Sequence, residues 1–196
     1  MMLDEPFSNL DISLRSQLRD LVLHVVKQTS ASTVIVTHDP EEAMFMGDRI
    51  AVMRDGRILQ QGTPEELYDH PESAFVAELF SEVNRIRGVV RNGRVETALG
   101  DITANGFAEG AEVEALVRPD SLILGPVEEG GASGKVLAAR MLGEFSLVHL
   151  GVEQGNDVED LHLHVRIPSR PRPREGNTVG IALDADRVFV FPAPER

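Results

Sequence analysis

The sequence predicts an α/β segment over residues 1–82, followed by an all-β segment over residues 85–192. In the first segment, two apolar runs typical of buried strands flank a helical pattern. After Phe80, short alternating runs separated by turn residues replace that pattern. Evenly spaced short strands of this kind favour a small barrel or a sandwich.

The first predicted helix spans residues 12–28, with Asp11 as its cap. Its apolar side chains repeat at helical spacing and form one stripe, which we expect to pack on a sheet. The stripe consists of Leu14, Leu18, Leu21, Val22 and Val25. A β-branched run over residues 33–37 follows and predicts a buried parallel strand, which ends directly before His38.

The next elements are short and have clear boundaries. A helix is expected from Asp39 or Pro40 to Met46, and a hairpin over residues 50–60 turns at Asp55-Gly56. Thr63 caps a further helix that begins with Pro64 and has a Glu at its third position. That helix ends near residue 70, and another spans residues 73–80.

The second half carries nine predicted strands, of which the first two flank the hairpin dipeptide Asn92-Gly93. They span residues 87–91, 94–98, 112–117, 122–124, 135–141, 146–150, 161–167, 179–183 and 188–191.

Composition excludes several classes of function. The net charge is −13, and residues 1–84 hold 15 acidic and 6 basic side chains. Such an acidic chain does not attract nucleic-acid backbones, so we expect no nucleic-acid partner. No cysteine is present, which excludes a disulfide framework. No apolar run reaches the length of a membrane span.

Two adjacent carboxylates, Asp4 and Glu5, follow the first apolar run, and Pro6 then ends the strand. In α/β sheets, functional groups lie just beyond the carboxyl ends of strands, which is where the acid pair and His38 both fall. A carboxylate pair suits metal-assisted phosphoryl transfer, in which one acid holds Mg²⁺ and the other polarises water. In isolation, such a pair is more often solvated surface charge.

The order of these motifs resembles the ATP-binding cassette (ABC) transporter ATPases. By that resemblance, Leu3–Pro6 is the end of Walker B, Ser8–Asp11 the D-loop and Thr37–Asp39 the switch-histidine loop. The resemblance implies that Glu5 and His38 are catalytic, and that Asp4 holds Mg²⁺. It also implies that Asp4, Ser8 and Asp11 bind MgATP, with Asp11 acting across a dimer; the alternative for Asp11 is a helix cap.

The Walker A loop, the Q-loop and the signature motif that precede Walker B in that family are absent from this sequence. We therefore expect the C-terminal part of such an ATPase, an incomplete P-loop domain that alone neither binds MgATP tightly nor hydrolyses it. The resemblance implies an importer subunit that forms a homodimer, binds permease subunits and acts indirectly with a solute-binding protein. It implies a peripheral location on the cytoplasmic face of the cell membrane.

Val117–Asp120 resembles a motif of TOBE domains, the OB-like barrels appended to such ATPases. Among importers, the second half looks most like the ferric-iron type. Two other classes remain open. One is a non-catalytic regulatory and dimerisation module that senses a small ligand. The other is a DNA-repair or SMC-like ATPase, which the acidic charge and the lack of long heptads disfavour.

For three further patterns, we prefer a structural interpretation to a functional one. Gly130–Lys135 imitates a phosphate loop, but Glu129 stands where a Gly is needed and Val136 where Ser or Thr is needed. We interpret residues 130–135 as a turn.

A predicted strand places His162 and His164 on one face, and His149 could lie on a neighbouring strand. We favour surface histidines over a metal site for these three residues. The proline- and arginine-rich residues 168–174 predict an extended surface connection rather than a contact with lipid or another subunit.

Overall fold

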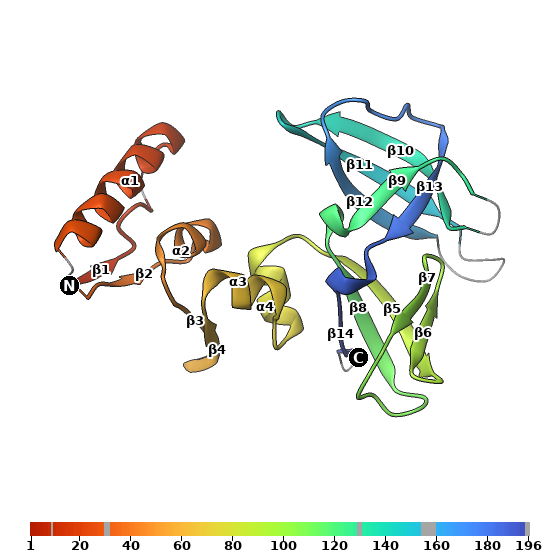
Figure 1. Ribbon diagram of the computed structural model, residues 1–196, viewed down its shortest axis with the longest axis horizontal. Helices are drawn as coiled ribbons and strands as arrows, with labels where there is room; N and C mark the ends of the chain where they lie inside the picture. The colour runs from red at the N-terminus through yellow and green to blue at the C-terminus, as the bar shows by residue number, and fades with distance from the viewer. Residues whose placement is uncertain (9, 30–31, 129–130, 154–159, 195–196) are drawn as a thin grey trace. The chain divides into compact units, whose positions relative to one another are not determined.

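The computed structural model describes residues 1–8, 10–29, 32–128, 131–153 and 160–194. The chain forms two compact units, Met1–Glu72 and Ser73–Arg196 (Figure 1). The sequence places the change of texture after Phe80. In the structure α4 (Ala74–Phe80) is already part of the second unit, where it contacts β14 (Val188–Pro192).

The first unit begins with a β-α-β arrangement. Strands β1 (Met2–Asp4) and β2 (Val34–Val36) pair in parallel, with Leu3 opposite Ile35, and α1 (Ile12–Thr29) connects them. The Leu14 N–H donates to the Asp11 carboxylate at 2.9 Å and so satisfies a free donor at the start of α1. The predicted helix and parallel strand are confirmed, but the strand is not buried as expected, because Val34 and Val36 are 60% and 42% exposed in this two-stranded sheet.

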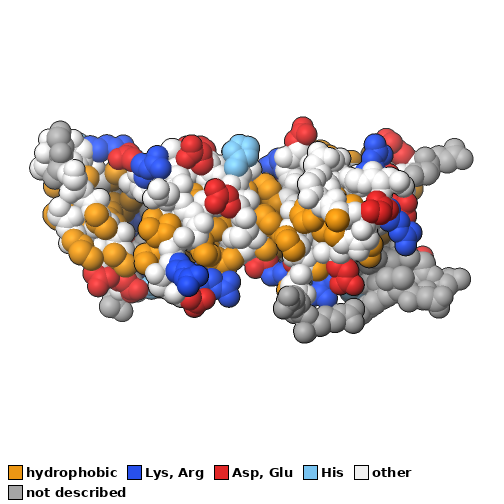
Figure 2. Space-filling view, turned by 90° about the horizontal axis from the view of Figure 1, so that it is seen from below, with side chains coloured by type: hydrophobic (Ala, Val, Ile, Leu, Met, Phe, Trp, Pro, Cys, Tyr) orange, Lys and Arg blue, Asp and Glu red, His pale blue; other side chains and the backbone are white. Residues whose placement is uncertain are grey.

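The apolar stripe of α1 is not packed on the sheet as expected. Leu14, Leu21 and Val25 are 42%, 56% and 46% exposed. The two-stranded sheet is too narrow to cover an 18-residue helix, and α1 instead contacts α2 (Pro40–Met46). Figure 2 accordingly shows hydrophobic side chains on the visible surface of this unit.

The remaining elements of the first unit follow their turn and cap residues. The hairpin of β3 (Ile50–Arg54) and β4 (Arg57–Gly62) turns at Asp55 and Gly56, which both have positive φ. In α3 (Pro64–Asp69), Thr63 and Glu66 form the expected reciprocal capping box. Both elements lie where the sequence predicts them.

The second unit is built from two five-stranded sheets, drawn one above the other in Figure 1. The strands run antiparallel, in the orders β14-β8-β5-β6-β7 and β12-β11-β10-β13-β9. They are β5 (Asn84–Arg91), β6 (Arg94–Thr97), β7 (Gly100–Thr103), β8 (Glu112–Val117), β9 (Leu122–Gly125), β10 (Ser133–Met141), β11 (Phe145–Val152), β12 (Leu161–Pro168), β13 (Thr178–Leu183) and β14.

One apolar core joins the two sheets, with residues such as Val90, Val113, Val148 and Leu163 fully buried. The predicted β-rich second segment is therefore confirmed, with β7 as a strand the sequence did not reveal. Lys135 lies in β10, as expected for a turn that leads into a strand. Glu129 and Gly130 of the phosphate-loop lookalike lie outside the described residues.

Candidate functional site

The candidate site lies where β1 and β2 end. Since the strands are parallel and Asp4 pairs with Val36, their carboxyl ends meet at one edge. The Glu5 N–H extends the ladder by donating to the Val36 carbonyl at 2.8 Å. Glu5 and His38 thus leave the sheet side by side, as the sequence predicts for two strands separated by one helix.

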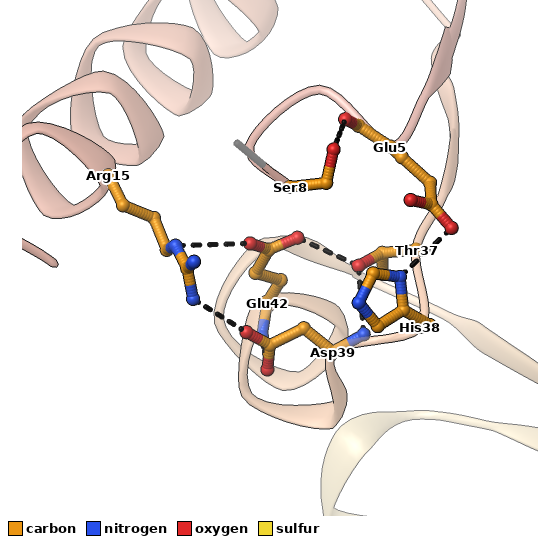
Figure 3. Close-up of a pocket in the computed structure, with 7 residues that line it drawn as sticks. All are labelled: Glu5, Ser8, Arg15, Thr37, His38, Asp39 and Glu42. Carbon is orange, nitrogen blue, oxygen red and sulfur yellow. Dashed lines mark hydrogen bonds and ion pairs between the residues drawn. The ribbon is translucent and has the colours of Figure 1, made fainter. Parts of the chain in front are cut away.

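Glu5 and His38 are in direct contact in Figure 3, with His38 Nδ1 2.9 Å from Glu5 Oε1. The hydrogen bond that the Glu5 carboxylate accepts, and then the charge of that carboxylate, raise the pKa of His38 above 6.5. The two side chains are 45% and 72% exposed, so solvent screens the pair. The arrangement combines a carboxylate with an imidazole whose ring N–H can donate to an anion.

A strained turn presents Glu5. Its φ is +43°, a conformation that a residue with a Cβ rarely adopts. The Ser8 backbone N–H and hydroxyl both donate to the Glu5 carbonyl, at 3.3 and 3.1 Å. Phe7 is only 2% exposed and anchors the turn. Ser8 therefore holds the backbone of Glu5, whereas its expected role toward a nucleotide stays a prediction; Asn9 of the same loop lies outside the described residues.

Sequence reasoning missed a network behind His38, centred on Arg15 and Glu42 (Figure 3). The Arg15 guanidinium lies 3.3 Å from the Asp39 carboxylate and 3.9 Å from that of Glu42. The Thr37 hydroxyl donates to Glu42 at 2.7 Å and accepts from the Asp39 N–H at 3.0 Å. Glu42 is 4% exposed, and its position in the first turn of a short helix gave no signal of this burial.

The network fixes both residues that flank His38. Thr37 and Asp39 are each held by two polar contacts, and Asp39 also caps α2 through the Glu41 N–H at 2.9 Å. A loop restrained on both sides positions His38 toward Glu5 and reduces the entropy lost on ordering it.

The described residues do not by themselves fit MgATP. Their cavity, lined by Glu5, Ser8, Arg15, Thr37, His38, Asp39 and Glu42, has a volume of about 30 Å³, comparable to the space of one water molecule. Asp4 and Asp11 do not line it; Asp4 is exposed and Asp11 caps α1. Within the described part of the chain, no group of three or more potential ligands could hold a metal ion.

The histidines of the second unit form a stacked pair. His149 on β11 and His164 on β12 are register partners, and their ring centroids lie 4.2 Å apart. Burial, then the charges of His164 and Arg140, lower the pKa of His149; Glu82 acts in the opposite direction. His162 lies opposite Gly151 and does not join the stack.

The sequence matches a known domain family and several curated proteins. Residues 115–191 match the TOBE domain family, which spans β8 to β14. The chain is 35% identical over 98% of its length to "Fe(3+) ions import ATP-binding protein FbpC 1" of Rhodococcus jostii. It is 33% identical over 97% of its length to "Spermidine/putrescine import ATP-binding protein PotA" of Borreliella afzelii. A "Sulfate/thiosulfate import ATP-binding protein CysA" of Caulobacter vibrioides is 36% identical over 81% of the chain.

Over most of its length, the chain is thus similar to ABC importer ATP-binding subunits. It spans about half the length of the curated relatives it matches: 55% of FbpC 1, 54% of PotA and 46% of CysA. A molybdate-bound form of the cytoplasmic molybdate-binding protein ModG aligns with 57% of this chain and 96% of ModG. The identity is 15% and the TM-score 0.44. Across the described residues, no helix has the length and apolar character that crossing a bilayer requires.

Proposed function

We propose that this chain contributes the carboxylate and imidazole side of a MgATP-hydrolysing site that drives solute uptake. The contact of 2.9 Å between Glu5 and His38, at the ends of two parallel strands, carries the proposal. A carboxylate there can orient or deprotonate water, and an imidazole held by it can donate to a terminal phosphate oxygen. Asp4 would hold Mg²⁺, and Ser8 and Asp11 would contact nucleotide from the loop that follows.

The phosphate cradle of such a site must come from a segment outside this sequence. Affinity for nucleotide in P-loop ATPases rests on backbone N–H groups and a Lys around the β- and γ-phosphates. The lookalike before Lys135 lacks the required residues at both ends. The proposed partners are a second ATPase subunit, permease subunits and, indirectly, a solute-binding protein, at the cytoplasmic face of the membrane.

Ferric iron is the solute we propose, with support from the relative named for Fe(3+) import. Relatives named for spermidine/putrescine and sulfate/thiosulfate have comparable identity. Sequence identity to these relatives therefore supports a role in solute uptake more strongly than it supports any one solute. A transport assay with radiolabelled iron, putrescine and sulfate decides between the three solutes.

The first test is calorimetry of the chain with MgATP, for which we expect no heat of binding. Binding of MgATP with micromolar affinity would overturn the inference that the phosphate cradle comes from another segment. The second test joins the chain to the N-terminal half of an FbpC relative and measures phosphate release. There, Glu5→Gln should retain ATP binding and lower turnover by about 10²-fold or more, as expected for the loss of a group that activates water.

His38→Ala should also lower turnover while ATP binding persists. His24→Ala is the matched control, because His24 lies on α1, where its ring contacts Gln28 at 2.9 Å, and does not line the cavity. Undiminished turnover in Glu5→Gln would remove Glu5 from the mechanism. Equal losses in His24→Ala and His38→Ala would remove the switch role from His38.

The second unit supports an additional candidate function, a regulatory and dimerisation module. Its own core joins two sheets and includes 18 buried apolar residues, so it does not depend on the first unit for its interior. Expression of residues 73–196 and measurement of mass in solution test this candidate. A folded dimer without nucleotide supports it, and a strictly monomeric product at high concentration counts against it.

A further inference from the structure

The second unit contains a groove between the two edge strands of one sheet. In the order β12-β11-β10-β13-β9, the outer strands β12 and β9 come close to each other without pairing. The groove between them has a volume of about 570 Å³. Leu122 and Ile123 of β9, Ile167 of β12 and Val179 of β13 supply apolar walls, to which the last residue of β12 and the segment after it add three prolines.

The groove carries a positive charge that is unusual for this chain. Residues 161–174 hold four Arg, two His and no acidic residue, whereas the remainder holds 15 basic and 32 acidic residues. Arg166, Arg172 and one carboxylate, Asp120, line the groove, and Asp120 is paired with Arg187 at 2.8 Å. Within the described chain neither Arg166 nor Arg172 makes an ion pair, although Arg166 lies over the Phe145 ring, 4.4 Å from its centroid. Two guanidinium groups beside an apolar wall favour a ligand with carboxylates and apolar side chains.

The backbone of β12 adds a second recognition element. The His164 N–H donates to the Asn84 side chain at 2.7 Å, and the His164 carbonyl accepts from it at 2.8 Å. These groups therefore point away from β11. In an antiparallel ladder the direction alternates, so the N–H and carbonyl of Arg166, two residues further, point the same way. At His164, the outer edge of β12 is occupied by the Asn84 side chain. At Arg166, the same edge borders the groove.

We propose that this groove binds an extended acidic peptide segment of a protein partner, which adds to the edge of β12 at Arg166. The peptide backbone pairs with Arg166, its carboxylates bind Arg166 and Arg172, and its alternate apolar side chains contact Ile123 and Ile167. Strand addition of this kind derives affinity from main-chain hydrogen bonds and specificity from alternate side chains. A membrane surface fits less well, since a lipid headgroup uses neither a strand edge nor a concave apolar wall.

Fluorescence anisotropy of the full chain tests the proposal, with a labelled Glu-Val-Glu-Val-Glu-Val peptide as the probe. We expect saturable binding that weakens at least fivefold in Arg172→Gln, and further in the double variant with Arg166→Gln. Ile123→Glu, at a 60% exposed position, should weaken it similarly by placing a carboxylate in the groove. Arg94→Gln is the matched control, since Arg94 is a 63% exposed arginine on β6, outside the groove. Circular dichroism confirms that each variant is folded.

Two altered probes separate the proposed mode from simple charge attraction. A peptide with Lys in place of Glu should not bind, and one with N-methylated valines should bind at least fivefold more weakly, because it cannot pair with a strand edge. Equal binding of either altered probe overturns the proposal, as does an equal loss in Arg94→Gln or the absence of saturable binding. Arginine-dependent binding to phosphatidylglycerol vesicles with none to the peptide would assign the groove to lipid instead.

Discussion

Replacing Asn84 by Ala should strongly destabilise the second unit. The side chain is 6% exposed and connects β5, β8 and β12. Its amide donates to the Val117 carbonyl at 3.2 Å and to the His164 carbonyl at 2.8 Å, and its oxygen accepts from His164 N–H at 2.7 Å. Alanine removes all three hydrogen bonds and leaves one buried carbonyl, that of Val117, and two partly buried backbone groups of His164 unpaired. At about 1 kcal/mol for each bond, we expect a loss of about 2–4 kcal/mol.

Urea denaturation followed by far-UV circular dichroism measures this loss. With a slope of about 2 kcal/mol/M, the midpoint should fall by about 1–2 M. Asn105→Ala, at an exposed turn position, should leave the midpoint unchanged. Asn84→Asp keeps the shape and the acceptor but loses both donated bonds, so it should also be destabilised. An Asn84→Ala midpoint equal to that of the wild type would refute the bridging role.

Three further predictions concern single residues. NMR titration of His38 should give a pKa above 6.5 that falls toward this value in Glu5→Gln, because Glu5 is the main cause of the increase; no change would exclude the pair in solution. Gly180→Ala should destabilise by about 1–3 kcal/mol, since its Cβ would overlap a backbone carbonyl of the loop after β9. Gly125→Ala meets no atom within 4 Å and is the control in the same melting experiment. The lowered pKa of His149 means that the unfolded chain binds its proton first, so stability should fall as pH drops through 6.5 toward the folded value. His149→Gln should flatten that dependence in urea titrations across pH, and an unchanged slope would contradict it.

Local signals predicted most of the elements. Asn92 and Gly93 both have positive φ between β5 and β6, as their residue types require. Thr63 and Glu66 form their capping box because both partners lie within four residues. Turns and helix caps depend on residues that are close in the sequence, and so they can be predicted without knowledge of the tertiary structure.

Non-local features were beyond the sequence. The apolar stripe of α1 suggested that this face of the helix is buried. The spacing of apolar residues does not indicate how wide the sheet beneath the helix is. The contact of Asn84 with His164 joins residues 80 positions apart, and no spacing rule indicates it. In the candidate site, Glu5 and His38 could be placed at one edge from strand order. The Arg15–Glu42 network could not, because it depends on the packing of α1 against α2.

The position of β8 constrains the order in which the second unit can assemble. Five of its six residues are buried, and it lies between β5 and β14. Its pairing with β5 joins Asn84 to Val117, whereas its other side is covered only when Val188 reaches Val117. During synthesis, about 70 residues must therefore follow β8 before its second edge is closed. Contacts between residues this far apart in the sequence slow folding. Until β14 pairs with β8, the unpaired edge of β8 is exposed, and the nascent chain is prone to aggregate.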